Sequence, residues 1–414
     1  MGAYNSADMV ALLLLFVLQT EGPLFEEKLL ARVPGSAPPE SVVFSPDGRR
    51  VMFHAGYKIH VDGEAVSDAN EGVQMIFSRD GKRAAHAARY GPKATVVIDG
   101  VREELGCRCL QFSEDSLHSA YVGVKEGEEF PVIDGKRGPS YAVVDGLGLS
   151  RDGKRSGFYA RQKNGKWVAV VDGKAGEEFE ELGPGPVRFS PDGATVAYQA
   201  KVGMKRLLVV NGKRQPEFAS TTFAFWSPDG KKLAYGATWY PELAKPKSVV
   251  IVNGQRSTEF YDTGVIVFSA DGRHMAYTAT DFPKTKERDE ECALMVIDGV
   301  RQPVGCASAR LTFSPSGSKW AYLRRVNKRV NVVLNGKSVA ELSEWGVRDF
   351  LFSPDESTLA LIGDNEGRWG IRVGDQRTEK WDAIAAAAFS ADGRSIAYSA
   401  RKGAELWRKV WTWK

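Results

Sequence analysis

The sequence predicts an all-β fold built from about ten copies of one four-stranded antiparallel unit. One phrase returns along the chain: an apolar strand, a Ser-Pro-Asp-Gly-like turn and an Ala-Tyr strand. Successive copies lie 33 to 45 residues apart, which is the length of one β-propeller blade. Ten serines mark the copies: Ser45, Ser78, Ser113, Ser150, Ser190, Ser227, Ser269, Ser314, Ser353 and Ser390.

Residues 185–218 illustrate how one copy forms a blade. Its first strand is expected over residues 187–189 and is followed by a Ser-Pro-Asp-Gly turn, in which Pro presets φ and Gly tolerates a positive φ. The second strand is expected over 195–200 and the third over 207–210. Asn211-Gly212 then suits a type I′ turn, because both positions of that turn need a positive φ. A fourth strand is expected to end near residue 218.

The second turn recurs with Asp or Asn before Gly. An ordinary residue in the left-handed region costs about 1–2 kcal/mol, which explains this choice of residues. The pairs begin at Asp62, Asp99, Asp134, Asp172, Asn253, Asp298 and Asn335. A calcium array is the alternative interpretation, but calcium ligands must converge on one ion and each turn belongs to its own blade. We therefore interpret these carboxylates as turn residues and expect no metal site.

Both ends of the chain contribute to ring closure. The last copy, from Phe389, lacks a fourth strand, and residues 25–33 provide an extra one before the first copy. We expect the amino-terminal strand to complete the last blade and cover two exposed sheet edges. This gives a β-propeller domain over residues 23–414, after an apolar segment over residues 1–22. Two smaller rings are the alternative to one ring of ten blades.

The apolar run of residues 9–18 is too short to span a bilayer and has the length of a signal-peptide core. We expect export to the periplasm or the extracellular space. Residues 1–8 contain no Lys or Arg and no clear cleavage site follows the run, so a cytoplasmic protein is the alternative.

Charge and cysteine content narrow the partners. Lys and Arg number 56 against 52 Asp and Glu, a mixed surface that does not indicate nucleic-acid binding. Cys292 and Cys306 flank a hairpin turn, and a disulfide between them is one prediction, two free thiols the other. Cys107 and Cys109 lack the further Cys or His residues of a zinc site, so we interpret both as structural.

Four phrases, FSPDGRRVMF, FSPDGATVAY, WSPDGKKLAY and FSADGRSIAY, resemble the WD40-like repeat (PD40) of bacterial propellers such as the propeller domain of the translocation protein TolB. The resemblance covers about residues 24–414. It implies the architecture but no particular activity, because this repeat occurs in scaffolds, binding proteins and the propellers of peptidases. Departures are local: Ser316 replaces the turn Asp, Ser116 and Glu356 replace the turn Gly, and Leu149 replaces the usual aromatic residue. They bring the regularity of the third, eighth and ninth blades into question.

The sequence offers little support for catalysis. No G-x-S-x-G nucleophile motif is present, as the propeller-bearing serine peptidases require. The five histidines are scattered, and a histidine within a strand is more often a satisfied structural residue than a metal ligand. We predict neither catalytic residues nor a cofactor, with a hydrolase acting on peptide or glycan in the central channel as the alternative.

The loops between second and third strands vary most along the chain, and binding sites often lie on such loops. Three consecutive blades carry the most distinctive ones, over residues 238–247, 281–291 and 324–329. Their aromatic and basic residues have the composition of an interface. The predicted binding residues are Trp239, Tyr240, Lys245, Lys247, Phe282, Lys284, Arg288, Arg324, Arg325, Lys328 and Arg329. Solvated loops whose aromatic residues pack onto the rim are the alternative.

The sequence as a whole predicts a non-catalytic propeller that binds a protein or peptide and has no membrane span. A small-molecule ligand is compatible with the same shape. An architectural subunit of a larger envelope assembly is a further alternative.

Overall fold

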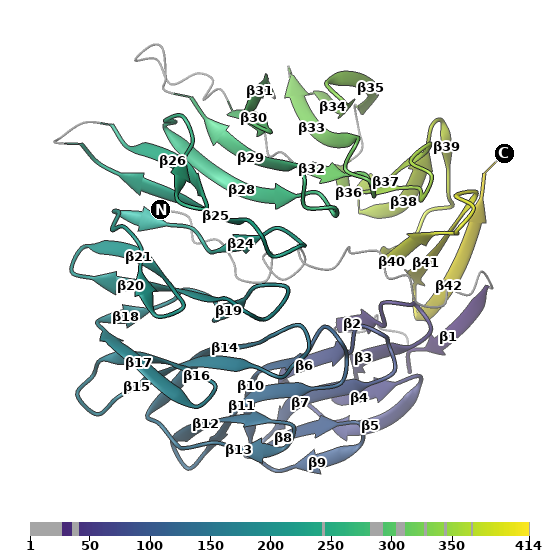
Figure 1. The fold of residues 1–414 in the computed structure, drawn as a ribbon. Helices are drawn as coiled ribbons and strands as arrows, with labels where there is room; N and C mark the ends of the chain where they lie inside the picture. The colour runs from purple at the N-terminus through teal and green to yellow at the C-terminus, as the bar shows by residue number, and fades with distance from the viewer. Residues whose placement is uncertain are drawn as a thin grey trace.

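The computed structural model describes residues 27–34, 41–241, 245–281, 293–303, 311–326, 329–342, 346–365 and 367–413. These residues form strands and no helix. Each motif serine belongs to its own antiparallel sheet, and the ten sheets stand in one ring (Figure 1). This confirms the predicted propeller as a single ring. We number the blades 1 to 10 in the order of their motif serines.

Blades 1 to 5 follow one another along the chain. Blade 1 contains β2 (Ser41–Phe44), β3 (Val51–Ala55), β4 (Lys58–Val61) and β5 (Glu64–Asp68). Blade 2 contains β6 (Glu71–Phe77), β7 (Ala84–Tyr90), β8 (Lys93–Ile98) and β9 (Val101–Glu103). Blade 3 contains β10 (Gly106–Phe112), β11 (Ser119–Lys125), β12 (Glu128–Ile133) and β13 (Lys136–Arg137). Blade 4 contains β14 (Val143–Leu149), β15 (Ser156–Arg161), β16 (Trp167–Val171) and β17 (Lys174–Phe179). Blade 5 contains β18 (Glu181–Leu182), β19 (Arg188–Phe189), β20 (Val196–Val202), β21 (Lys205–Val210) and β22 (Lys213–Arg214).

Blades 6 to 10 complete the ring. Blade 6 contains β23 (Ser220–Thr221), β24 (Phe225–Trp226), β25 (Leu233–Trp239), β26 (Lys247–Val252) and β27 (Gln255–Arg256). Blade 7 contains β28 (Asp262–Phe268), β29 (Met275–Thr280), β30 (Ala293–Ile297) and β31 (Val300–Pro303). Blade 8 contains β32 (Leu311–Phe313), β33 (Trp320–Val326), β34 (Arg329–Leu334) and β35 (Lys337–Leu342). Blade 9 contains β36 (Gly346–Phe352), β37 (Leu359–Asn365), β38 (Arg368–Val373) and β39 (Gln376–Arg377). Blade 10 contains β40 (Ala383–Phe389), β41 (Ser395–Lys402), β42 (Glu405–Thr412) and β1 (Lys28–Arg32).

Blade 10 joins the two ends of the described chain. Strand β1 pairs antiparallel with β42, with Lys28 opposite Arg408 and Arg32 opposite Glu405. The main-chain N–H of Val33 continues the contact by donating to the carbonyl of Ala404 at 2.8 Å. The predicted closure by the amino-terminal strand is therefore confirmed. It covers the edge of β42, which would otherwise be exposed.

The predicted turn chemistry is also confirmed. Asn211 has φ 47° and Gly212 has φ 75°, so the turn between the third and fourth strands of blade 5 needs the left-handed region at both positions. The first strand of each blade lies nearest the centre of the ring and the fourth lies at its rim (Figure 1). The turns after the first and third strands share one face, which we call the turn face. The loops after the second strands lie on the opposite face, which we call the loop face.

The hydrophobic core lies between the blades. Side chains from both faces of each sheet meet the neighbouring sheets, so the buried clusters extend across blade junctions. At the closing junction, for example, Ala31 and Leu406 of blade 10 pack with Phe53 of blade 1. The tyrosines of the Ala-Tyr strands are buried, and Tyr159 and Tyr322 are among the largest fully buried side chains. A single blade could not bury both of its faces, so the ring folds as one domain.

The three blades whose regularity the sequence brought into question are regular. Blades 3, 8 and 9 are each complete four-stranded sheets. Ser116 and Glu356 occupy the turn position of Gly with φ 68° and 61°, so the turns keep their shape although these residues disfavour it.

Candidate functional site

The motif turns are closed by their own side chains. In blade 2, the Ser78 hydroxyl donates to Asp80 Oδ1 at 2.6 Å and accepts the main-chain N–H of Arg83 at 2.9 Å. Asp80 Oδ1 also accepts the N–H of Lys82 at 3.1 Å. Hydrogen bonds of the same kind, first of all from Ser353, lower the pKa of Asp355 to about 2. All ten motif serines are buried, so the repeated Ser and Asp residues build turns rather than a catalytic or metal site.

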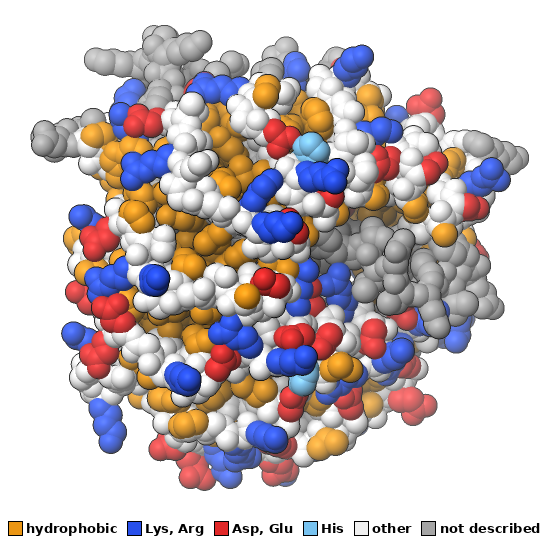
Figure 2. All heavy atoms as spheres, in the orientation of Figure 1, with side chains coloured by type: hydrophobic (Ala, Val, Ile, Leu, Met, Phe, Trp, Pro, Cys, Tyr) orange, Lys and Arg blue, Asp and Glu red, His pale blue; other side chains and the backbone are white. Residues whose placement is uncertain are grey.

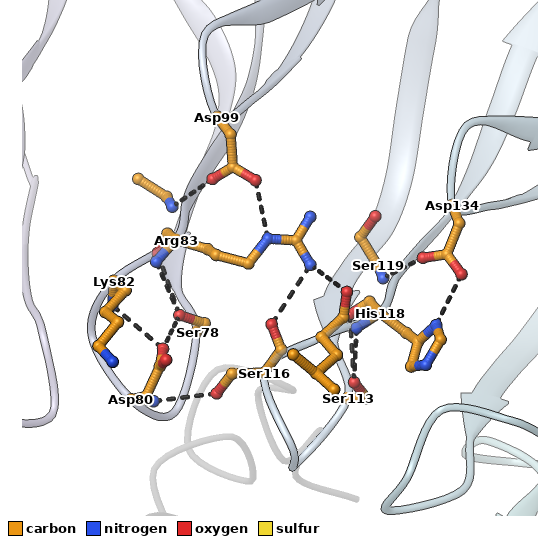
Figure 3. A network of polar contacts seen from close by, with 12 residues as sticks. Ser78, Asp80, Lys82, Arg83, Asp99, Ser113, Ser116, His118, Ser119 and Asp134 are labelled. Atoms are coloured by element: carbon orange, nitrogen blue, oxygen red, sulfur yellow. Dashed lines mark hydrogen bonds and ion pairs between the residues drawn. The ribbon is translucent and has the colours of Figure 1, made fainter.

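A second contact of the turn face joins each blade to the next. We call the residue five positions after the motif serine the latch residue. In blade 2 it is Arg83, whose Nε donates to Asp99 Oδ2 at 2.7 Å (Figure 3). Its Nη1 donates to the carbonyls of Ser116 and Leu117 in blade 3, at 3.3 and 2.6 Å. The guanidinium therefore connects the two turns of its own blade to the first turn of the next.

Other blades make the same contact with their own latch residues. Arg155 of blade 4 pairs with Asp172 at 2.9 Å and donates to the carbonyls of Gly193 and Ala194. Lys232 of blade 6 likewise reaches two carbonyls of blade 7. The remaining latch residues are Arg50, His118, Thr195, His274, Lys319, Thr358 and Ser395. Five of the ten latch residues, Arg50, Arg83, Arg155, Lys232 and Lys319, bond to carbonyls of the next blade.

The loop face presents a different surface. Four exposed large apolar side chains lie at or beside the tips of its second-to-third-strand loops, in two pairs of adjacent blades. They are Tyr57 in blade 1, Tyr90 in blade 2, Met204 in blade 5 and Tyr240 in blade 6, with exposed fractions of 66%, 51%, 91% and 64%. Tyr57 also has φ 62°, an unfavourable conformation for a bulky residue. Sequence analysis missed the first three; an apolar residue beside the loop glycine is the signal that could have found them.

The predicted binding loop of blade 6 divides into packed and free residues. Trp239 is half-buried, its ring centroid 6.3 Å from that of Phe218, with the Arg256 guanidinium 5.7 Å from the Trp239 ring. Lys247 forms an ion pair with Glu259 at 2.7 Å. Tyr240 and Lys245 are exposed. Trp239 and Lys247 therefore hold the base of the loop, and Tyr240 and Lys245 are available to a partner.

The other predicted loop residues are less fully described. Arg324 is half-buried in β33. Arg325 lies next to it in β33, and Arg329 begins β34. Phe282, Lys284, Arg288 and Lys328 lie outside the described residues, as do Cys292 and Cys306 of the predicted disulfide.

The inner wall of blade 3 is polar. Arg108 of β10 forms an ion pair with Glu129 and donates to the carbonyl of Val144 in blade 4 at 3.1 Å. Cys109 is exposed at a bulge of β10 with φ 54°, and Cys107 is half-buried. Local desolvation of the sulfur and the nearby Asp145 carboxylate raise the pKa of the Cys109 thiol, and burial with the neighbouring Cys109 raises the pKa of Cys107 to about 12. Both thiols therefore stay protonated and are weak nucleophiles near neutral pH.

Three histidines are core residues. His54 and His86 lie in second strands and each forms a hydrogen bond, His86 with the Ser67 hydroxyl at 2.7 Å. His60 stacks on Phe53 with ring centroids 4.6 Å apart. Burial and then Arg102 lower the pKa of His86 to about 4, so it is neutral at physiological pH. Over the residues that the structure describes, no three His, Cys, Asp or Glu side chains are grouped to hold a metal ion.

In the described part of the chain, no helix has the length and apolarity needed to cross a membrane.

The solved structures compared with this chain have low sequence identity and low TM-scores. No protein-family model matches the chain, and no curated protein matches it. A crystal structure of the eukaryotic initiation factor is 11% identical over 77% of this chain and 89% of its own, with a TM-score of 0.48. The Dos1 propeller is 11% identical over 94% and 96%, with a TM-score of 0.39. The β-propeller domain of the Trilobed protease from Pyrococcus furiosus is 11% identical over 66% and 94%, with a TM-score of 0.34. The assignment as a propeller of WD40-like repeats depends on the chain's own motifs and sheets.

Proposed function

We propose that this chain is a non-catalytic β-propeller scaffold that binds a protein or peptide through its loop face. The observation that carries the proposal is the set of four exposed apolar tips, Tyr57, Tyr90, Met204 and Tyr240. Tyr and Met are enriched in the cores of protein interfaces, and a rigid ring presents them with little loss of conformational freedom on binding.

The opposite face is less suited to such a partner. The motif serines use their hydroxyls within their own turns, and latch residues such as Arg83 and Arg155 are bonded to the next blade. Its exposed large apolar residues, Val101, Leu117 and Val300, are aliphatic and lie on separate turns. Figure 2 shows that Lys, Arg, Asp and Glu side chains are interspersed on the viewed face, which gives no field of one sign for a polyanion.

Peptide selection tests the proposal. Peptides from a displayed random library would be selected on the wild-type protein and then measured by calorimetry against two variants. The loop-face variant carries Tyr57→Ser, Tyr90→Ser, Met204→Ser and Tyr240→Ser. The turn-face control carries Val101→Ser, Leu117→Ser and Val300→Ser, which removes exposed apolar side chains from the opposite face. We expect the loop-face variant to bind at least about tenfold more weakly and the control to bind as the wild type does.

Two outcomes would contradict this function. Equal binding to both variants would place the partner elsewhere on the ring. Cleavage of the selected peptides by the wild-type protein, detected by mass spectrometry, would favour a hydrolase that uses the channel.

Export remains a separate proposal, supported by the apolar run of residues 9–18. The amino-terminal residue of the protein purified from its native host tests it. A start near residue 23 supports cleavage of a signal peptide, and an intact start at Met1 or Met9 supports a cytoplasmic location.

A further inference from the structure

The junction between blades 3 and 4 lacks a complete latch. Its latch residue is His118, whose Nδ1 bonds to Asp134 Oδ2 at 2.7 Å (Figure 3). The ring packs directly on Gly153 of blade 4, where an added Cβ would lie 2.3 Å from His118 Cδ2. Unlike Arg83, the imidazole makes no hydrogen bond to the carbonyls of the next turn.

Two carbonyls are left without a donor as a result. Gly153 and Lys154 stand three and four residues after the motif serine Ser150. At other junctions the carbonyls of the same two positions accept hydrogen bonds from the latch residue, which is Arg83, Arg155 or Lys232. No described residue donates to the carbonyls of Gly153 or Lys154. An unpaired carbonyl gains most from a charged donor, because charge-assisted hydrogen bonds are the stronger ones.

A second departure from the repeat lies at the same junction. The guanidinium of Arg83 lies 4.7 Å from the ring centroid of Phe112, and that of Arg155 lies 5.0 Å from Phe189. The corresponding residue of blade 4 is Leu149, which has no aromatic ring. The shorter latch residue and the missing ring coincide with a cavity of about 420 Å³ at this junction. It is lined by His118, Asp134, Gly153 and Lys154 together with Pro131, Ile133, Lys136, Arg137 and Gly138.

We propose that this cavity, the blade 3–4 pocket, takes the guanidinium of an arginine side chain supplied by a partner peptide. The incoming group would donate to the carbonyls of Gly153 and Lys154 and complete from outside the contact that Arg50, Arg83 and Arg155 make within the chain. This site is separate from the loop face, so it does not depend on the function proposed above.

The basic residues around the pocket do not argue against a cationic ligand. Arg50 donates to the carbonyl of Lys82, and Lys232 donates to the carbonyl of Arg273, so other latches already place a cation beside a basic residue of the same turn. Arg137, which lines the pocket, is already paired with Glu103 at 3.3 Å and lies over the ring of Phe130. The local acceptors therefore determine the class of ligand more than the flexible, solvated charges do.

The matched junction between blades 7 and 8 provides an internal control. Its latch residue is also a histidine, His274, which bonds to Asp298 at 2.6 Å. There the aromatic residue of the next blade is retained, and the His274 ring stacks on Phe313 with centroids 6.3 Å apart. The missing aromatic ring thus distinguishes the blade 3–4 pocket from this second histidine latch.

Histidine-selective ¹⁵N NMR of the full chain tests the proposal. Titration with acetyl-Gly-Arg-Gly-amide is expected to shift the side-chain signals of His118 in a saturable way and to leave those of His274 unchanged. The signals are assigned with His118→Gln and His274→Gln. The citrulline peptide, which has a similar shape but no charge, is expected to bind about tenfold more weakly. The lysine peptide is also expected to bind more weakly, because a single ammonium lacks the planar fork of donors.

A filled-pocket variant completes the test. His118→Arg with Leu149→Phe restores the residues of neighbouring junctions and is expected to abolish binding of the arginine peptide. His274→Arg, at the equivalent latch of blade 7, is expected to leave binding unchanged. The proposal is overturned if the arginine peptide causes no saturable shift, if the citrulline or lysine peptide binds equally well, or if the filled-pocket variant still binds.

Discussion

Glu356 of blade 9 supplies the carboxylate that Ser316 of blade 8 lacks. Ser316 stands where other motif turns have Asp, and its main-chain N–H donates to Glu356 Oε1 at 2.5 Å. The Ser318 hydroxyl donates to Glu356 Oε2 at 2.9 Å. Glu356 itself replaces a turn glycine, so the two departures from the repeat compensate each other. Ser116 of blade 3 acts similarly, since its hydroxyl accepts the N–H of Asp80 in blade 2 at 3.0 Å.

This pairing predicts strong coupling between the two positions. Ser316→Asp alone places a second carboxylate beside Glu356, and Glu356→Gly alone leaves the turn of blade 8 without a carboxylate, so each should lower the free energy of unfolding. The double variant restores the common repeat and should regain the wild-type value. A double-mutant cycle by urea denaturation should give a coupling energy of about 1–3 kcal/mol. Additive effects of the two changes would contradict the compensation.

The latch of blade 2 should contribute measurably to stability. Arg83→Met removes the bonds to Asp99 and to the two carbonyls of blade 3, and we expect a loss of about 1–3 kcal/mol in the free energy of unfolding. Arg83→Lys should recover part of this loss, because an ammonium keeps the charge but not the planar geometry. Lys93→Met, at the exposed first residue of β8, serves as the control. An equal effect of Arg83→Met and Lys93→Met in urea denaturation would show that the latch is not stabilising.

The buried His86 predicts a loss of stability in mild acid. Its pKa is about 4 in the folded protein, mainly because of burial, and about 6.5 when unfolded. Between these values the unfolded chain binds more protons, so the contribution of His86 is fully present above pH 6.5 and is lost as pH falls toward 4. Melting temperatures from pH 7.5 to 4.5 should fall less steeply for His86→Gln than for the wild type. Met204→Ser, at an exposed loop residue that carries no titratable group, should follow the wild-type curve. Matching slopes for all three proteins would refute the assignment.

Ring closure depends on the small buried side chain of Ala31. This residue packs against Leu406 and Phe53, so Ala31→Asp would bury a charge without a partner at the junction of blades 10 and 1. We expect β1 to detach and expose the edge of β42, which should lower the melting temperature and promote association of the ring. Lys28→Asp, at an exposed residue of the same strand, should have little effect. Calorimetry with light scattering distinguishes the two, and a monomeric, fully stable Ala31→Asp protein would contradict the role of this strand.

The sequence by itself determined the blades and their turns. The spacing of motif serines such as Ser190, the Asn211-Gly212 pair and the unpaired strand after Phe389 each follow from local chain chemistry, namely which residues tolerate a positive φ and which strand lacks a neighbour. These features involve residues close together in the chain, or the sheet edge at its two ends, so the repeat alone predicts them.

The tertiary structure decided how neighbouring blades meet. Three such contacts depend on residues about 20 to 40 positions apart. Glu356 compensates for Ser316, Trp239 packs on Phe218, and a cavity lies beside His118 and Gly153. In the sequence, four separate irregularities stand at Ser116, Leu149, Ser316 and Glu356. Only the ring brings them to the junctions between blades. A repeat specifies its own strands, whereas the contact between two repeats depends on side-chain lengths and orientations that no single copy contains.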